Sequence, residues 1–358
     1  MAATAESFDM VNRRAFLASL GAAGVGALAG CSSSGKTAPS TSTGDADSPV
    51  KLAYDAAPPH FQAVVMNKEG WLEDLPAPVE PKTASCNSIV QLLVSGKADI
   101  GMIGIIPALV VADSEAPTHI VSASSKNAFV VLVREEWADR FETETDVFEA
   151  FATETGRTFE LGTYPKGSVS DITARYWIGE ERGESLDQVS LKHLGGPGAA
   201  RQALLAGEVD GAVIPEPTPT LIEATTDAPY RRITDVGEFI PGEPAGVTVV
   251  RDEFAEANPE FVEAFVSKHA AATEFIRTEP DQAATYMSEV YGGESALDAA
   301  TAREALDSPA TEYVTDPHEV TDGTEVLAEY ASRLGKTDRV HGVDELYELS
   351  YYEAAVEQ

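Results

Sequence analysis

The chain has 358 residues, of which 43% are hydrophobic, enough for one large globular body or for two lobes that each bury a core. Its 59 acidic and 25 basic residues give a formal net charge of -34, which excludes a nucleic-acid-binding surface because phosphate contacts need clustered Lys and Arg. An anionic bilayer surface is disfavoured as a partner for the same reason.

This charge has a consequence for the solvent in which the protein works. At low ionic strength, mutual repulsion of the carboxylates destabilises a folded chain, whereas at molar salt the Debye length is only about 3 Å and the repulsion is screened. The composition therefore indicates a halophilic source organism, and an ordinary acidic protein is the alternative.

The start of the chain has the pattern of an export signal. The pair Arg13-Arg14 precedes an uncharged apolar stretch that is too short and too weakly apolar to span a bilayer permanently. The segment Leu28–Cys31 then resembles a lipobox, in which cleavage before the cysteine leaves Cys31 for lipid attachment. We predict a twin-arginine lipoprotein signal peptide over 1–30, followed by a flexible tether over 31–49.

Signatures of catalysis are missing from the sequence. Gly30–Thr37 fits the pattern of a phosphate-binding loop, but such a loop must follow a buried strand and open a helix, whereas this one lies between a signal peptide and a tether. There is no HExxH, CxxC or GxSxG motif, and the 6 His are scattered. With Cys31 assigned to the lipid, Cys86 has no disulfide partner, and we expect a structural role for it. We expect no catalytic residue, no metal site and no cofactor.

From Val50 onward, short apolar strands alternate with helices. We expect strands at Val50–Tyr54, Ile100–Ile103, His119–Ser122, Phe129–Arg134, Phe159–Leu161, Val189–His193, Gly211–Ile214 and Val247–Val250. The expected helices are Phe61–Asn67, Ile89–Val94, Val147–Ala152, Ser170–Gly179 and Ala199–Leu205, with further helices from Asn258-Pro259 onward. This alternation predicts an α/β fold in which a parallel sheet carries helices on both faces.

One sequence pattern occurs twice. Leu92–Gly101 and Leu204–Gly211 both run from a helix through a Gly, a charged residue, one further residue and an Asp into a strand. Glycine suits this place because a helix end commonly needs a left-handed residue. The repetition predicts two similar α/β lobes with a cleft between them, and chance similarity of two turns is the alternative.

Several stretches after Val50 are similar to a known family. They are Lys51–Asp55 followed by Ala63–Leu72, Ser95–Gly101, Ala206–Val213 with Glu216-Pro217 after it, and Arg175–Ile178. Together they resemble type 2 periplasmic binding proteins of the nitrate, sulfonate, taurine, bicarbonate and thiamine-precursor group. The resemblance covers nearly all of the chain after Val50.

The resemblance implies a type 2 periplasmic-binding-protein fold, with two α/β lobes joined by a hinge of two crossing segments that trap a ligand when the lobes close. We expect the crossings near Val131–Arg134 and Gly246–Val250. This places 50–131 and 248–358 in lobe 1 and 132–247 in lobe 2.

Ligands of open α/β sheets lie at the carboxyl ends of the strands. We therefore expect the ligand to be bound by residues that follow the predicted strands, namely Asp55, His60, Phe61, Asn87, Ser88, Gly104, Ile105, Ser125, Asn127, Tyr164, Lys166, Gly167, Ser168, Gly196 and Glu216. Several of these precede a helix, whose free N–H groups bind anions. Capping of the helix is the alternative role for Asn87 and Ser88.

The resemblance also implies a function. We expect a non-enzymatic, monomeric solute-binding protein, held by its lipid on the outer face of the cytoplasmic membrane, that delivers a small molecule to an ABC permease and its ATPase. The helix starts and Arg175–Trp177 favour a small anion such as nitrate, bicarbonate or a sulfonate. His60 favours a thiamine-pyrimidine precursor, because such relatives carry a His there, and Asp55 and Glu216 would repel an anion unless they point away. A second class of protein is a pyrimidine-forming enzyme of thiamine synthesis, which has the same fold but carries a Cys-rich motif that is absent here, and the export signal argues against a cytoplasmic enzyme. A tethered solute sensor for chemotaxis is the third alternative.

Overall fold

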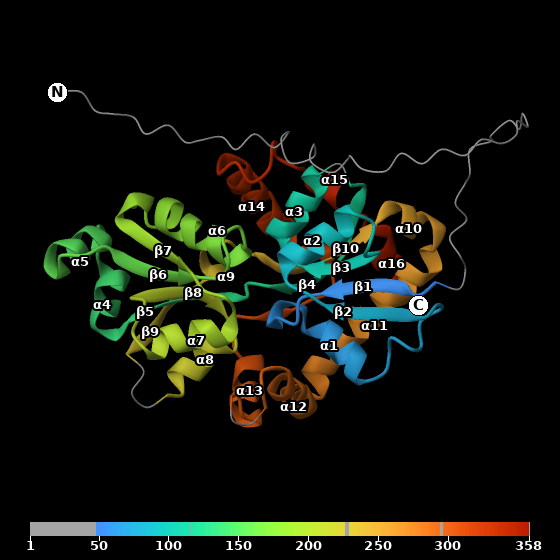
Figure 1. Ribbon diagram of the computed structural model, residues 1–358, viewed down its shortest axis with the longest axis horizontal. Helices are drawn as coiled ribbons and strands as arrows, with labels where there is room; N and C mark the ends of the chain where they lie inside the picture. The colour runs from blue at the N-terminus through green and yellow to red at the C-terminus, as the bar shows by residue number, and fades with distance from the viewer. Residues whose placement is uncertain (1–47, 115, 226–228, 294–295, 358) are drawn as a thin grey trace, which may run out of the picture. The chain divides into compact units, whose positions relative to one another are not determined.

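The computed structural model describes residues 48–114, 116–225, 229–293 and 296–357 (Figure 1). The predicted signal peptide, Cys31 and nearly all of the predicted tether lie outside these residues. Within them, none of the helices combines the length and the apolar character needed to cross a membrane.

The described residues form two sheets, which we call sheet A and sheet B. Sheet A has the order β11-β4-β10-β3-β1-β2, and its strands are β1 (Val50–Tyr54), β2 (Val79–Thr83), β3 (Ile100–Ile103), β4 (Thr118–Lys126), β10 (Pro244–Arg251) and β11 (Glu312–Tyr313). Sheet B has the order β7-β6-β8-β5-β9, and its strands are β5 (Phe129–Arg134), β6 (Phe159–Thr163), β7 (Val189–His193), β8 (Gly211–Pro215) and β9 (Tyr230–Asp235).

Both sheets are mixed, so the prediction of a parallel sheet is only partly right. β1 runs parallel to β2 and β3, and β6 runs parallel to β7 and β8. β10 is antiparallel to β3 and β4, and β5 is antiparallel to β8 and β9. The reason is that β5 and β10 each arrive from the other sheet, and therefore start at the edge where the neighbouring parallel strands end.

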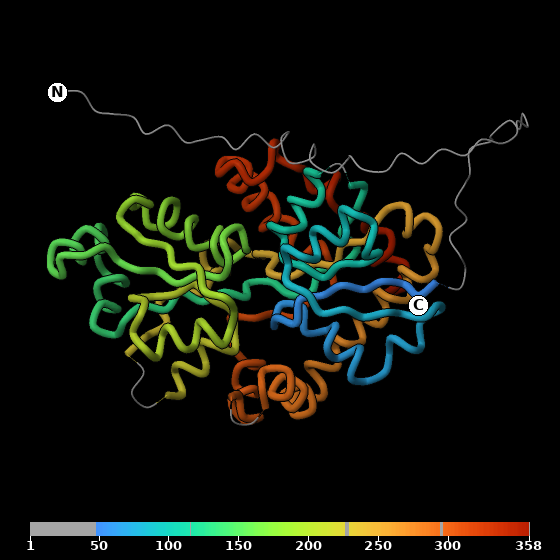
Figure 2. Tube along the Cα trace, in the orientation of Figure 1, coloured from blue at the N-terminus to red at the C-terminus, as the bar shows by residue number. Residues whose placement is uncertain are grey.

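The chain changes sheet in two places that the trace shows clearly (Figure 2). The first crossing is Asn127-Ala128, between β4 and β5, and the second is 236–243, between β9 and β10, which contains the short helix α9 (Val236–Phe239). The expected crossings lie a few residues later, inside β5 and β10, and so do the expected lobe boundaries. At the first crossing the shift arises because Asn127-Ala128 is too short to interrupt the apolar pattern of the strands on either side.

Helices cover both faces of sheet A. Side chains on one face of β1, β3 and β10 share a core with α2 (Cys86–Val94), α3 (Ile105–Asp113) and α14 (Thr321–Arg333). Side chains on the other face share a core with α1 (Phe61–Lys68), α11 (Pro259–Thr278), α12 (Pro280–Val290), α13 (Ala299–Leu306) and α16 (Ser350–Val356). Two shorter helices also pack near sheet A: α10 (Asp252–Ala257) contacts β10 and α11, and α15 (Val343–Leu346) contacts β4 and α14.

Sheet B is covered in the same way, and β5 shows the alternation. Val131 and Val133 join the core of α4 (Glu135–Thr143), α5 (Val147–Thr155) and α6 (Val169–Tyr176). Val130 and Leu132 join the core of α7 (Pro197–Leu205) and α8 (Thr218–Glu223). A run that is apolar at every position is thus explained by burial on both faces.

The repeated sequence pattern is confirmed as a repeated structure. Gly96 and Gly207 both have a φ of 67° and connect a helix to a strand. Asp99 Oδ2 accepts a hydrogen bond from Lys51 N at 2.9 Å, and Asp210 Oδ2 accepts one from Glu160 N at 3.0 Å. In each lobe the Asp side chain therefore links the start of one strand to its parallel neighbour: Asp99 links β3 to β1, and Asp210 links β8 to β6.

Candidate functional site

A cavity of about 640 Å³ lies where parallel strands of both sheets end. Sheet A contributes residues that follow β1, β2 and β3, and sheet B contributes residues that follow β6 and β7. Its described lining is Asp55, Ala56, Ala57, Thr83, Ala84, Ser85, Cys86, Asn87, Pro107, Tyr164, Pro165, Ser168, Gly195, Gly196, Pro197, Gly198, Val290 and Tyr291. A site built from both sheets at their carboxyl ends is suited to hold a small solute between them.

A second, smaller cavity of about 60 Å³ shares part of this lining. Asp55, Cys86, Tyr164 and Ser168 border both cavities, so the two spaces adjoin. The smaller one reaches His60 and residues of the crossing strands β5 and β10. Movement at the crossings would therefore displace residues that line the smaller cavity.

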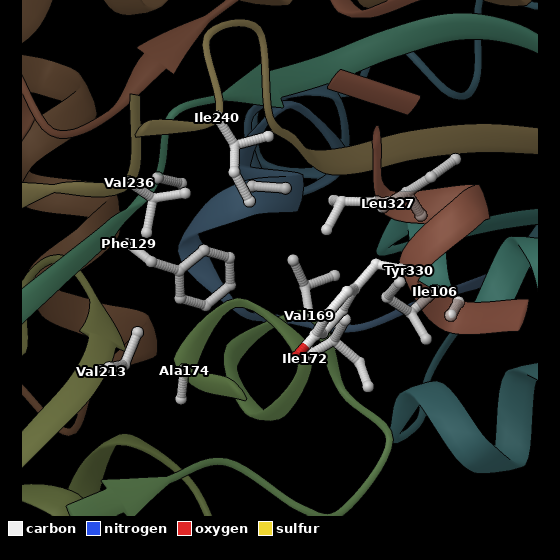
Figure 3. Packing of buried hydrophobic residues seen from close by; sticks show 14 of the residues in the cluster. Ile106, Phe129, Val169, Ile172, Ala174, Val213, Val236, Ile240, Leu327 and Tyr330 are labelled. Carbon is white, nitrogen blue, oxygen red and sulfur yellow. The ribbon is translucent and has the colours of Figure 1, made fainter. Parts of the chain in front are cut away.

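Beside the site, an apolar cluster joins elements that pack on the two sheets (Figure 3). Ile106 from α3, Val169 and Ile172 from α6, and Leu327 and Tyr330 from α14 are all buried and belong to this one cluster. Apolar contact between α6 on sheet B and α3 and α14 on sheet A therefore holds the two halves together on this side.

Asp55 is the charged residue of the cavity lining. The Cys86 thiol donates a hydrogen bond to Asp55 Oδ2 over a sulfur–oxygen distance of 3.2 Å. Burial raises the pKa of Asp55, while the Cys86 thiol and the backbone N–H groups of Cys86 and Ala57 act in the opposite direction. Burial and the nearby Asp55 charge both raise the pKa of Cys86. Cys86 is therefore a protonated donor to Asp55 and not a nucleophile, because the thiolate is the reactive form.

Two tyrosines, Tyr164 and Tyr291, line the same cavity. The hydroxyl oxygens of both are buried; the Tyr291 hydroxyl has no hydrogen-bond partner among the described residues, whereas the Tyr164 hydroxyl interacts with the side chain of Thr218. Burial raises the pKa of both, and the Asp55 charge raises them further, while the side chain of Thr218 opposes the rise at Tyr164. Both phenols are therefore neutral.

His60 lies deep beside the smaller cavity, with 2% of its surface exposed. Burial and the neighbouring His269 lower its pKa to about 3, so the imidazole is neutral. Its Nδ1 is buried and has no hydrogen-bond partner in the described part of the chain.

Seven of the fifteen predicted site residues line one of these cavities. The main cavity takes Asp55, Asn87, Tyr164, Ser168 and Gly196, and the smaller one also takes His60 and Gly104. The lining of neither cavity includes Phe61, Ser88, Ile105, Ser125, Asn127, Lys166, Gly167 or Glu216.

Some of the latter side chains are used elsewhere in the chain. Phe61 and Ile105 are buried in the cores of the first lobe, and the Ser125 hydroxyl donates to Pro59 O at 3.1 Å. Glu216 Oε1 accepts hydrogen bonds from Arg232 Nη2 at 2.8 Å and from Ser308 Oγ at 2.7 Å.

We expected Gly167 and Ser168 to bind an anion at the start of a helix, but the side chain and backbone of Asp171 already bind them. Gly167 N donates to Asp171 Oδ2 at 2.9 Å, and the Ser168 hydroxyl accepts from Asp171 N at 3.3 Å as the N-cap of α6. Arg175 in turn pairs with Asp171, and Lys166 is exposed. These groups form a closed network in which a carboxylate already fills the place expected for a ligand.

The start of α2 also differs from expectation. The helix begins at Cys86, with Ser85 as its N-cap, so Asn87 and Ser88 lie in the first turn and do not cap it. Asn87 lines the cavity, whereas Ser88 is exposed, with its Oγ 3.0 Å from Ser85 Oγ.

Sequence reasoning missed other lining residues, above all Cys86 and Tyr291. Cys86 stands at a helix start after a strand, which is the position that pointed to Asn87 and could have pointed to Cys86. Tyr291 follows α12, far along the chain from the strands that build the site, and no local pattern marks it. Among the described residues, no group of three or more His, Cys, Asp and Glu side chains could hold a metal ion.

Comparison with solved structures supports the fold. The chain is 18% identical to the periplasmic aliphatic sulphonate binding protein SsuA of Escherichia coli, with a TM-score of 0.67 over 84% of this chain and 92% of that one. For the periplasmic nitrate-binding protein NrtA of Synechocystis PCC 6803, the identity is 15% and the TM-score is 0.68 over 86% of this chain and 88% of that one. The zinc-bound ligand-binding component of an ABC-type import system of Staphylococcus aureus is 15% identical, with a TM-score of 0.65 over 86% of this chain and 98% of that one.

All three are binding proteins, and their likeness confirms the predicted fold. The sequence has no significant match among curated proteins. A family model, described as the NMT1-like family, matches residues 44–290, which is more than half of the chain. The chain therefore belongs to the NMT1-like family.

Proposed function

We propose that this protein is an exported solute-binding protein that captures one small solute in the main cavity and delivers it to an ABC permease and its ATPase. The observation that carries the proposal is the cavity itself, which is lined from both sheets beside the two crossings. A solute that contacts both sheets stabilises the closed arrangement and shifts the population toward it. The solved structures that share the fold are binding proteins and include a component of an ABC importer.

Delivery to a permease can be separated from sensing by identifying the partner. Cross-linking in intact cells, followed by purification of this protein and mass spectrometry, is expected to recover an ABC permease. Recovery of a chemotaxis receptor in its place would contradict the transport role and favour the tethered sensor.

The membrane anchor is a separate part of the proposal and rests on the twin-arginine pair and the lipobox-like segment of the sequence. Replacing Arg13 and Arg14 with Lys is expected to block export, and Cys31→Ser is expected to release the exported protein from the membrane. Fractionation would decide the matter: a Cys31→Ser protein that stays fully in the membrane fraction would rule out the lipid anchor.

A small anion, the solute class favoured from the sequence, keeps one support at this site. Gly196 and Pro197 at the start of α7 line the cavity, and the first turn of a helix offers free N–H groups. Nitrate, bicarbonate and a sulfonate therefore belong in a melting-temperature screen, in which a true solute at 100 times its Kd stabilises the protein by about 2.7 kcal/mol.

A further inference from the structure

We propose that the cavity selects a compact, largely apolar solute that carries a cationic nitrogen group, an ammonium or an amidinium, and that Asp55 binds this group. The inference rests on the proposed solute-binding function and specifies the solute at that same site. It is opposite in sign to the anion expected from the sequence.

The first argument is the charge of the lining. Among the described residues that border either cavity, Asp55 carries the charge, and the lining includes no Lys or Arg. Lys166, Arg175 and Lys336 interact with one another or with Asp171, and all three lie outside the lining. An anion in the main cavity would therefore meet a carboxylate without a compensating cation, in a protein whose formal charge is -34.

The second argument is that Asp55 has no ion-pair partner among the described residues. An ionised carboxylate can accept about four hydrogen bonds. Asp55 accepts hydrogen bonds from the Cys86 thiol, a weak donor at 3.2 Å, and from the backbone N–H groups of Cys86 and Ala57, and none of these donors carries a charge. Burying a carboxylate is costly unless it is paired. A cationic N–H donor would supply the missing countercharge together with one further hydrogen bond.

The third argument is that aromatic residues line the cavity together with Asp55. Tyr164 and Tyr291 line the same cavity, and both residues interact electrostatically with Asp55. Neutral tyrosines attract cations through the face of the ring. His60 is neutral, so it does not repel a cation.

The fourth argument is the remainder of the lining, which is apolar. Ala57, Ala84, Pro107, Pro197 and Val290 present carbon to the cavity. Such a surface suits a hydrocarbon or ring skeleton better than a fully hydrated inorganic ion. The solute is thus expected to pair one polar end with Asp55 and to bury an apolar body.

Matched probes separate charge from shape. Benzamidine, benzamide and benzoate have nearly the same size but are cationic, neutral and anionic, and cyclohexylamine with cyclohexanecarboxylate forms a second such set. Calorimetry is expected to rank each cation first and each carboxylate last. Asp55→Asn is expected to weaken binding of the cations by about tenfold or more, because it removes one member of a buried charge pair.

Controls distinguish loss of binding from loss of folding. Asp187→Asn removes the same charge from an exposed position outside the lining and is expected to leave the Kd unchanged. Tyr291→Leu removes the aromatic ring and leaves Asp55 in place, so reduced cation binding by this variant supports the site even if Asp55→Asn folds poorly.

The outcomes also separate this inference from the proposed function. X-ray scattering reports lobe closure for any solute that binds. If an anion of the panel binds and compacts the protein while no cation does, the solute class is wrong but the solute-binding function stands. If cations bind equally well to wild type and Asp55→Asn, the assignment to Asp55 is overturned. If no cation of either set binds at millimolar concentration, the solute class is overturned as well.

Discussion

Asn127 and Glu243 fasten the two crossings to each other. Asn127 Oδ1 accepts hydrogen bonds from the backbone N–H groups of Gly242 at 3.1 Å and Glu243 at 3.2 Å, and Asn127 N donates to Glu243 O at 2.9 Å. Glu243 Oε2 accepts from Ala128 N at 3.2 Å. Asn127, which we expected among the ligand contacts, thus joins the two crossings about which the lobes would move.

Removing the Asn127 side chain should loosen this junction. Asn127 has a φ of 56°, a left-handed conformation that Ala adopts poorly and Gly adopts freely. Asn127→Ala is expected to lower the free energy of unfolding by about 1–3 kcal/mol through the lost hydrogen bonds, with additional backbone strain. Urea unfolding of Asn127→Ala and Asn127→Gly would separate the two causes. Equal stability of wild type and both variants would show that the junction contributes little.

Glu243 should make the stability depend on pH. The residue is fully buried, and burial raises its pKa from 4.5 to about 8. Because the raised pKa means that the folded state holds the proton more tightly than the unfolded state, this contribution to stability is fully present below pH 4.5 and is lost as the pH rises through about 8. The loss is a few kcal/mol at most.

The Gln variant tests this dependence against the background of all other carboxylates. Gln cannot ionise, so unfolding of Glu243→Gln is expected to depend less on pH than unfolding of the wild type between about pH 5 and 8. Parallel pH profiles of the two proteins would contradict a raised pKa at Glu243.

Glu216 should matter for stability and not for the solute. Its carboxylate is buried, with hydrogen bonds from Arg232 on β9, from Ser308 after α13 and from Thr220 N at the start of α8. Glu216→Gln leaves Arg232 with a weaker partner and is expected to cost about 2–5 kcal/mol of the free energy of unfolding. Calorimetry with a bound solute should return the wild-type Kd. A large change in Kd without a change in melting temperature would place Glu216 at the ligand after all.

Salt should stabilise the folded chain. With a formal charge of -34, repulsion among carboxylates is screened at molar salt and unscreened when the salt is removed. The melting temperature is therefore expected to fall as salt is diluted from molar to millimolar concentration. A melting temperature that stays constant over this range would argue for an ordinary acidic protein.

The fold was predictable wherever a local pattern carried it. Gly96 and Gly207 marked two helix ends, and the strands between Val50 and Val250 that are buried on both faces were visible as apolar runs. β2 was not visible, because it is an edge strand whose residues are mostly exposed and include Pro81. The first crossing was misplaced because Asn127-Ala128 is too short to interrupt the apolar pattern of the strands on either side.

The site was only partly predictable, because its residues come together through the topology. Asp55, Tyr164 and Gly196 each follow a strand, and the rule about strand ends finds them. Tyr291 comes from a helical region that no sequence pattern connects to the cavity. Gly167 has the right local chemistry for an anion, but Asp171 takes its N–H group, which only the three-dimensional structure reveals.

The apolar cluster that joins α3, α6 and α14 gives lobe motion a temperature dependence. Opening on that side would expose Ile106, Ile172 and Tyr330 to water, and exposure of apolar surface raises the heat capacity. Since hydrophobic contact weakens on cooling, the population of open molecules should be larger in the cold. Solute binding that closes the lobes should then show a negative heat-capacity change, and a value near zero would mean that this contact persists in both states.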